Sequence, residues 1–423
     1  MSDANAKDEG ATDDVVLCIN SGSSSLKFAV FVASGVDARN VTHATRATAR
    51  DGEPRQIATG GVERIGHDDG RAWLHGFGAP AERTGKFADH AAALDVLFAL
   101  LDEARAPTAT VVGHRVVHGG ANHVAPARVD DALVADLQAL VPLAPLHLPA
   151  AIAGIEAVRV RFPKLPQVAC FDTAFHRTMP EVARRLPLPD AITREGVRRY
   201  GFHGLSYEYV MSTLGDAPPS RIVIAHLGNG SSLVAVKDGK AIDTTMGFTP
   251  SGGVMMGTRT GDLDPGVLVY LLREKKLSAD ALEDLVERKS GLAAIGGVSD
   301  VKTLLTRAAT DERARLALSM FAYSVRKAIG AFAAALGGID LLIFTGGIGE
   351  HAAAVRADIA AGLEHLGVQL DPRRNEGANG DDARAGTVIN IDGGRCAVRV
   401  VATDEDLVIA RHVLETTHRE RTR

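Results

Sequence analysis

The sequence predicts an α/β fold with two similar lobes. An apolar strand, a Gly/Ser turn and a second strand follow one another at 15–28, in VVLCINSGSSSLKF. The same order returns at 221–243, in RIVIAHLGNGSSLVAVKDGKAID. Around these openings, strands alternate with longer helical patterns such as ALVADLQALV and MFAYSVRKAIGAFAAAL, which is typical of helices that cover a mixed sheet.

The first Gly/Ser turn holds more polar groups than a chain reversal needs, because one glycine or Asn-Gly pair is enough for a hairpin. We expect its amides and side chains to form a cradle for a phosphate or a metal-bound water. The side chains concerned belong to Asn20, Ser23, Ser25 and Lys27.

The second Gly/Ser turn repeats the first when Gly22 is placed opposite Gly228. That alignment pairs Asn20 with His226 and Ser25 with Ser231. Two such turns predict a duplicated chain, and we expect Asn229 and Gly230 to form the second half of a phosphate cradle.

A third glycine turn, FTGGIGE at 344–350, follows the apolar strand 339–345 and leads into a helix near Glu350. A helix N-terminus behind a glycine turn suits an anion or a nucleotide. The segment from about Thr45 to Pro80 is weakly patterned, and we expect strands and loops peculiar to the first lobe there.

The composition excludes several classes of function. Lysine and arginine number 47 against 52 acidic residues, a net charge of −5, so the chain has no general field for nucleic acid or acidic membranes. Residues 1–13 are acidic and lack an apolar core, which predicts a disordered tail and no secretory signal. Three scattered cysteines are typical of reduced core thiols in a cytoplasmic protein. Prolines interrupt the longest uncharged stretch, 137–155, which argues against a membrane helix.

Familiar catalytic motifs are absent from the sequence. It has no Walker-A loop, no G-x-S-x-G elbow and no H-E-x-x-H. The glycine turns do not fit G-x-G-x-x-G, and the cysteine spacing gives no zinc cluster.

A further series of motifs spans nearly the whole chain. They are GHRVVHGG (113–120), LAPLHLP (143–149), FDTAFH (171–176), RRYGFHG (198–204), AHLGNGSS (225–232), MGFTP with MMGTRTGDLDPG (246–266), FTGGIGE (344–350) and TDEDLVIAR (403–411). Together with the opening turn they resemble the acetate and propionate kinases in composition and order.

The resemblance implies the duplicated ribonuclease-H-like fold of the actin, sugar-kinase and Hsp70-like superfamily, with a cleft between the two lobes. It implies an N-terminal lobe at 14–172, completed by a C-terminal helix at 404–423, and a nucleotide-binding lobe at 173–403. The expected activity is acetate kinase: reversible transfer of a phosphoryl group from ATP to acetate by direct in-line attack. The alternatives are a propionate or butyrate kinase and, in another class, a nucleotide-driven chaperone or sensor.

The chemistry of this reaction agrees with the residues that the motifs carry. Two anions must meet, and charge spreads over the transferring oxygens, so the site needs fixed positive charge and not a base. By resemblance, Arg115 and Arg259 bind the acetate carboxylate and neutralise the transition state. By resemblance, His203 hydrogen-bonds the phosphoryl group and Asp172 orients an arginine and the attacking carboxylate. Arginine suits the first role, since it stays charged and grips planar oxygens with two bonds.

The resemblance also places the remaining ligands. The implied acyl pocket consists of Val117, Leu146, Phe202 and Pro250, and the bulk of Val117 favours acetate. Mg²⁺, for which Mn²⁺ can substitute, is implied at Asn20 and Glu405. The implied nucleotide-binding residues are Lys27, His226, Leu227, Gly228, Asn229, Gly230, Asp300, Val301, Lys302, Gly347, Ile348, Gly349, Glu350 and His351. A homodimer is implied as well, although the apolar helix at 316–336 is more typical of a core.

Some residues depart from the pattern of the resembled kinases. Ser251 and Gly252 stand where Leu-Glu is common, which predicts a looser loop before Arg259. Tyr207 replaces a frequent histidine. Further departures are Lys302, His351 and Asp404.

Overall fold

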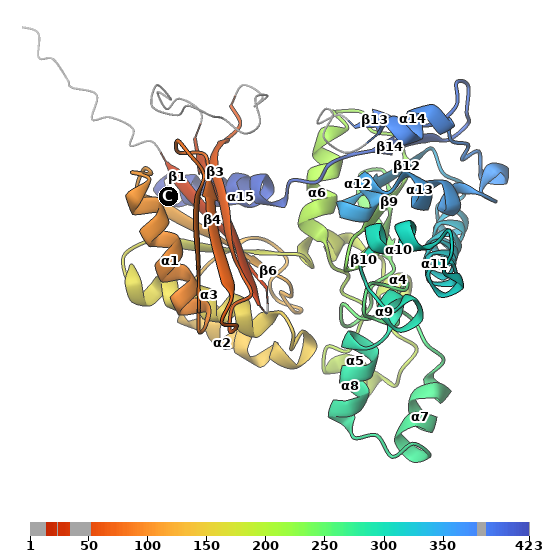
Figure 1. The fold of residues 1–423 in the computed structure, drawn as a ribbon, viewed down its shortest axis with the longest axis horizontal. Coiled ribbons are helices and arrows are strands. Elements are labelled where there is room, and N and C mark those ends of the chain that lie inside the picture. Colours follow the sequence, from red (N-terminus) through yellow and green to blue (C-terminus); the bar gives the residue numbers. More distant parts are fainter. Residues whose placement is uncertain (1–13, 23, 34–51, 379–385, 423) are drawn as a thin grey trace, which may run out of the picture. The chain divides into compact units, whose positions relative to one another are not determined.

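The structure is a computed structural model that describes residues 14–22, 24–33, 52–378 and 386–422. Its contacts divide the chain into two compact units (Figure 1). The first unit takes in the described residues up to Val116, then Ala125–Cys170 and those from Asp406 on. The second contains Val117–Val124 and Phe171–Glu405, so residues 117–124 group with it and not with the expected N-terminal lobe. The expected tail at 1–13, Ser23 and the start of the 45–80 segment lie outside the described residues.

A mixed sheet forms the centre of the first unit. Its described strands have the order β5-β4-β3-β2-β1-β6-β8-β7. Strand β1 is antiparallel to β2 and parallel to β6. The elements are β1 Val15–Ser21, β2 Ser25–Val32, β3 Arg55–Glu63, β4 Gly70–His75, β5 Ala81–Gly85, α1 His90–Glu103, β6 Val111–Val116, β7 Ala127–Arg128, α2 Asp131–Ala139, the 3-10 turn η1 Val141–Leu143, α3 Leu148–Arg161, β8 Gln167–Phe171 and α15 Glu405–Arg421.

Helices cover both faces of this sheet. Val112 belongs to the core that also contains residues of α1 and α3. Successive strand residues face opposite sides, so Gly113 faces away from that core. A Cβ at Gly113 would lie only 2.4 Å from Cγ2 of Ile409 and 2.7 Å from Cγ2 of Val413. Helix α15 therefore covers the second face, at a distance that only glycine allows.

The second unit is built on a sheet whose described strands have the order β11-β10-β9-β12-β14-β13. Its elements are η2 Ala174–Thr178, α4 Glu181–Arg184, α5 Asp190–Arg194, α6 Gly204–Thr213, β9 Arg221–Leu227, β10 Ser231–Lys237, β11 Lys240–Thr244, α7 Pro265–Arg273, α8 Ala279–Arg288, α9 Gly291–Gly296, α10 Val301–Arg307, α11 Glu312–Leu336, β12 Leu341–Thr345, α12 Gly346–His351, α13 Ala353–Ala360, η3 Glu364–Leu366, α14 Pro372–Gly377, β13 Thr387–Val388 and β14 Ala397–Val400.

The two faces of the second sheet have different partners. Val223 and Ala225 of β9 face a core formed with α9, α10, α11 and α13. By strand alternation, His226 faces the other side, where α6 contacts β9. Figure 1 shows α6 and α11 on opposite sides of β9 and β12. The helix α11, expected to be a core helix, buries one face and exposes Leu316 and Met320 on another.

The two sheets repeat one arrangement, which confirms the duplicated α/β fold. In each, a central strand pairs antiparallel with the strand that follows, which pairs antiparallel with a third. In each, the central strand also pairs parallel with a later strand. Strands β3 and β4 confirm that the 45–80 segment contributes strands to the first unit.

The two opening turns differ in length, which corrects the alignment made from sequence. Ser21 pairs with Leu26 across the first turn, whereas Leu227 pairs with Ser231 across the second. The first turn therefore contains one more residue, and Leu26, not Ser25, corresponds to Ser231. No helix within the described ranges has the length and apolar character needed to span a bilayer.

Candidate active site

Arg259 lies in a glycine-rich loop that the start of α9 holds in place. The backbone N–H groups of Ser290 and Leu292 donate to loop carbonyls at 2.9 and 3.0 Å. Gly291 has φ 62°, and a Cβ there would lie 2.1 Å from the carbonyl oxygen of Met256. Only glycine allows this approach. The loop geometry is therefore set by the fold of the second unit.

The Arg259 guanidinium is partly buried beside one carboxylate. Its Nη1 donates to the carbonyl of Pro250 at 3.2 Å. Burial lowers the pKa of Arg259, and the charge of Glu287 opposes that change. Ser251 donates a hydrogen bond to Oε1 of Glu287 at 2.5 Å. The residue expected to loosen this loop thus ties it to α8, and the guanidinium stays charged at neutral pH.

Two histidines stack face to face in the second unit. Their ring centroids are 4.2 Å apart, and the planes of His203 and His226 differ by 19°. His203 precedes α6 with φ 58°, a left-handed conformation that costs a non-glycine residue some strain. Its Nδ1 lies 2.8 Å from Oγ of Ser232, and Nδ1 of His226 lies 2.8 Å from Oγ of Ser206. Each ring is therefore oriented by a serine.

His203 and Arg259 meet at the second Gly/Ser turn. A Cβ on Gly230 would lie 3.4 Å from Nε2 of His203 and 3.5 Å from Nη1 of Arg259. A Cβ on Gly346, in the third glycine turn, would lie 3.1 Å from Nε2 of His226. The arginine, the two rings and the third turn thus form one continuous series within the second unit.

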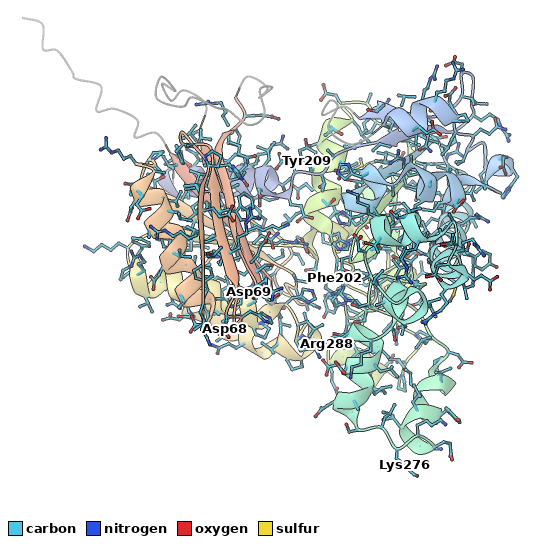
Figure 2. The ribbon with its side chains drawn as sticks, in the orientation of Figure 1. Asp68, Asp69, Phe202, Tyr209, Lys276 and Arg288 are labelled. Atoms are coloured by element: carbon cyan, nitrogen blue, oxygen red, sulfur yellow. The ribbon has the colours of Figure 1, made fainter. Side chains whose placement is uncertain are left out.

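An apolar cluster borders the arginine. Phe202, Met246 and Met256 are buried together, and Val117 packs against them (Phe202 is labelled in Figure 2). Sδ of Met256 lies 4.0 Å from Nη1 of Arg259. A guanidinium beside an apolar cluster suits a short carboxylic acid, with its carboxylate on the cation and its methyl group on the cluster. The sequence prediction missed both methionines, although Met256 stands in the quoted motif MMGTRTG.

A cavity of about 710 Å³ lies within the second unit. Three of the predicted nucleotide-binding segments supply part of its lining. From these segments the lining residues are Gly228, Asn229, Asp300, Val301, Lys302, Gly347, Ile348 and His351. The predicted nucleotide-binding residues that do not line it are Lys27, His226, Leu227, Gly230, Gly349 and Glu350. Asp300 also caps α10, since its Oδ1 accepts from the N–H of Thr303 at 2.8 Å. The hydrogen bond from the Thr303 hydroxyl, together with this N–H bond, lowers the pKa of Asp300.

Glu350 stabilises the third glycine turn through hydrogen bonds from the backbone. Its Oε1 accepts from the N–H of Gly346 at 2.8 Å and from the N–H of Thr403 at 3.1 Å. Burial raises the pKa of Glu350, and these two amide bonds oppose the rise. The side chain connects the turn to the segment that leads to Glu405. The geometry indicates a positioning role more than direct nucleotide contact.

Arg356 is a second support that the sequence prediction missed. Its side chain is fully buried, and Nη1 donates to the carbonyls of Gly349 and Glu350, each at 2.9 Å. Nε donates to Oδ1 of Asn375 at 2.8 Å. Burial lowers the pKa of Arg356 to about 10, which leaves it charged at neutral pH. The one available signal is a basic residue in the apolar run AAAVRADIAA.

The remaining predicted residues stand at the ends of strands and helices. On β1, Asn20 pairs with Lys27 of β2, whose side chain is exposed. Arg115 on β6 is half-buried in the first unit, as is Leu146 before α3. The roles of these four stay predictions.

Asp172 and Glu405 both belong to the second unit. Asp172 is 1% exposed directly after β8, and its carbonyl accepts from the N–H of Gly204 at 3.0 Å. Glu405 is the first residue of α15 and is half-buried. Their expected roles stay predictions too.

Comparison with known proteins decides the family. The model of the acetokinase family matches residues 15–411. The chain belongs to the acetokinase family. Acetokinase-family relatives include the acetate kinase of Rhodopseudomonas palustris (strain ATCC BAA-98 / CGA009), which is 44% identical over 410 residues, 95% of this chain and 98% of the relative.

Solved acetokinase-family structures agree with this assignment. Porphyromonas gingivalis acetate kinase matches with a TM-score of 0.82 and 36% identity, over 96% of this chain and 100% of that one. A propionate kinase from Francisella tularensis subsp. tularensis SCHU S4 matches with a TM-score of 0.84 and 33% identity, over 95% and 99%. The predicted family and enzyme class, a phosphotransferase with a carboxyl acceptor, are confirmed, as is the prediction of acetate kinase at the level of the family.

Proposed function

We propose that this acetokinase-family enzyme transfers a phosphoryl group from ATP to acetate, reversibly, giving acetyl phosphate and ADP. The convergence of His203 Nε2 and Arg259 Nη1 on Gly230 carries the proposal. One end of this series borders the apolar cluster, which suits the acetate methyl group. The third glycine turn at the other end also lines the 710 Å³ cavity, which suits a nucleotide.

The proposed chemistry is electrostatic. The acetate carboxylate is already a nucleophile at neutral pH, so no base is needed. Arg259 holds the carboxylate and stabilises charge on the transferring group, and His203 donates to a phosphoryl oxygen. Arg115 supplies a second cation, and Asp172 orients the reacting groups. The phosphoryl group passes directly from one oxygen to the other.

Magnesium, replaceable by manganese, is proposed at Asn20 and Glu405. Within the described ranges, no three His, Cys, Asp or Glu side chains cluster as a metal site. Mg²⁺ needs no such cluster, since it keeps several waters and is often held by one or two side-chain oxygens together with phosphate. The amide and carboxylate oxygens of the two residues fit that requirement.

Metal removal should abolish turnover. The bound ion neutralises phosphate charge, so enzyme assayed in excess EDTA is expected to form no acetyl phosphate. Adding back Mg²⁺ or Mn²⁺ in excess should restore the rate. Undiminished activity in EDTA would contradict the metal proposal while leaving the arginine proposal standing.

Acid selectivity is the test of the proposed substrate. Val117 packs against the apolar cluster, and its bulk leaves less room for a longer acid. One methylene changes the discrimination between substrates in such pockets by about 1–3 kcal/mol. We expect kcat/KM to be roughly tenfold or more higher for acetate than for propionate, and lower again for butyrate. Trapping the acyl phosphate with hydroxylamine measures all three. A tenfold preference for a longer acid would make the protein a propionate or butyrate kinase, and ATP hydrolysis without any hydroxamate would favour a sensor.

The same proposal includes a cytoplasmic homodimer. Cys18, Cys170 and Cys396 are buried thiols, which is compatible with a reducing compartment. Helix α7 is apolar, yet none of its residues is buried. Its exposed Val267 and Tyr270 suit contact with a second copy of the chain.

Light scattering tests that interface. Tyr270→Asp places a charge on the apolar face of α7 and should convert a dimer into a monomer. Lys276→Glu, at the exposed residue labelled beyond α7 in Figure 2, changes charge without removing apolar surface and should leave the dimer intact. A monomeric parent protein, or equal masses for all three proteins, would remove α7 from the proposal.

A further inference from the structure

Tyr207 is a buried side chain that the proposed mechanism does not use. It lies on α6, is fully buried, and its hydroxyl contacts Oγ of Ser232. The same Ser232 oxygen lies 2.8 Å from Nδ1 of His203. Three side chains thus form a hydrogen-bonded chain from the helix, through the strand β10, to the histidine.

The direction of the two hydrogen bonds follows from what each group can donate. A buried hydroxyl hydrogen without an acceptor is costly. Among the described residues, Ser232 is the one hydrogen-bond partner of the Tyr207 hydroxyl. The tyrosine therefore donates its hydrogen to Ser232. The Ser232 hydroxyl then accepts from the tyrosine and donates its own hydrogen to Nδ1 of His203.

The direction of this chain fixes the proton of the imidazole. A ring nitrogen that accepts a hydrogen bond carries no proton, so in neutral His203 the proton is on Nε2. Nε2 is the atom that lies beside the Gly230 turn. We infer that Ser232 is a positioning residue, which accepts from Tyr207 and donates to Nδ1, and so keeps His203 as a neutral Nε2–H donor to the phosphoryl group. The last step rests on the proposed function, whereas the proton position does not.

The charged and titratable groups around His203 agree with a neutral ring. His226 stacks on it, and two adjacent imidazolium rings would repel. Nη1 of Arg259 lies beside the same turn. Asp172 interacts electrostatically with Tyr207, and burial raises the pKa of Tyr207 well above its usual value, so the tyrosine keeps its hydrogen.

Nitrogen-15 NMR of histidine-labelled protein tests the proton position without turnover. The His203 signals are assigned among the 15 histidines by comparison with His203→Gln. We expect the parent protein to show Nε2 protonated and Nδ1 unprotonated at pH 7.5. In Ser232→Ala, Nδ1 loses its donor, so the signals should move towards a mixture of tautomers, whereas in Tyr207→Phe the buried Ser232 hydroxyl still has Nδ1 as its acceptor and Nε2 should stay protonated. A proton on Nδ1 in the parent protein would overturn the inference, even if no acetyl phosphate is formed.

Kinetics separate positioning from a structural role. Ser232→Ala should lower kcat about fivefold at pH 7.5, the factor that one neutral hydrogen bond of ordinary strength controls, with KM values unchanged. The loss should shrink as the pH falls, because a protonated ring has a proton on Nε2 whatever Ser232 does. Tyr207→Phe should lose less, because Ser232 still donates to Nδ1.

Tyr209→Phe is the matched control, since it removes a hydroxyl from the same helix without touching the Ser232 chain (Tyr209 is labelled in Figure 2). It should leave the tautomer and the pH profile unchanged. A loss in Ser232→Ala that is constant with pH, or one that Tyr209→Phe shares, would overturn the positioning role.

Discussion

Replacing Arg259 with alanine is expected to lower kcat by roughly a thousandfold or more, as for other arginines that stabilise phosphoryl transfer. The loop around Arg259 is held by backbone hydrogen bonds from α9, which do not involve the guanidinium. The substitution should therefore remove the charge without unfolding the loop. Steady-state formation of acetyl hydroxamate measures the effect.

Two further variants sharpen the Arg259 test. Arg259→Lys keeps the charge but loses the bidentate grip, so we expect it to recover only a small part of the rate. Arg288→Ala, at the arginine labelled on α8 in Figure 2, removes an exposed guanidinium and should leave kcat within twofold of the parent enzyme. A loss below tenfold in Arg259→Ala would remove this residue from the mechanism.

Replacing Arg356 with alanine is expected to lower the free energy of unfolding by about 3–5 kcal/mol. The change leaves buried acceptors without their donor, because the guanidinium also donates to the carbonyls of Asn375 and Ala378 at 2.6 and 2.8 Å. Urea denaturation measures the loss. ATP binding should weaken as well, since Gly349 and Glu350 belong to the third glycine turn.

Arg326 provides the comparison for Arg356. It too donates to backbone carbonyls, those of Asp358 and Ile359, but it lies nearer the surface, where water can replace the bonds. Arg326→Ala should cost less than about 1.5 kcal/mol. If Arg356→Ala costs no more than Arg326→Ala, the buried charge is not what holds the turn.

The sequence could predict the features that depend on local patterns of residues. Alternating apolar residues and the repeated Gly/Ser turns predicted the two α/β halves. The motifs predicted the family and marked three segments that line one cavity. The sequence did not reveal the extra residue in the first turn, because an ungapped alignment contains no information on which strand residues pair.

The supports of the site were not predictable in this way. Tyr207 reaches His203 through a serine 25 residues away along the chain. Arg356 holds Asn375, which lies 19 positions further on. Met246 and Met256 meet Phe202 only after folding. Such contacts depend on tertiary packing, and no local periodicity encodes them.

The order of segments along the chain affects how the protein emerges from the ribosome. The sheet face at Gly113 is covered by α15, which follows the second unit along the chain. Translation must pass through most of the second unit before that helix exists, which takes roughly 10–50 s at about 5–20 residues per second. During that interval the nascent N-terminal sheet lacks its cover, so its apolar face is open to chaperones and to aggregation until α15 has been made.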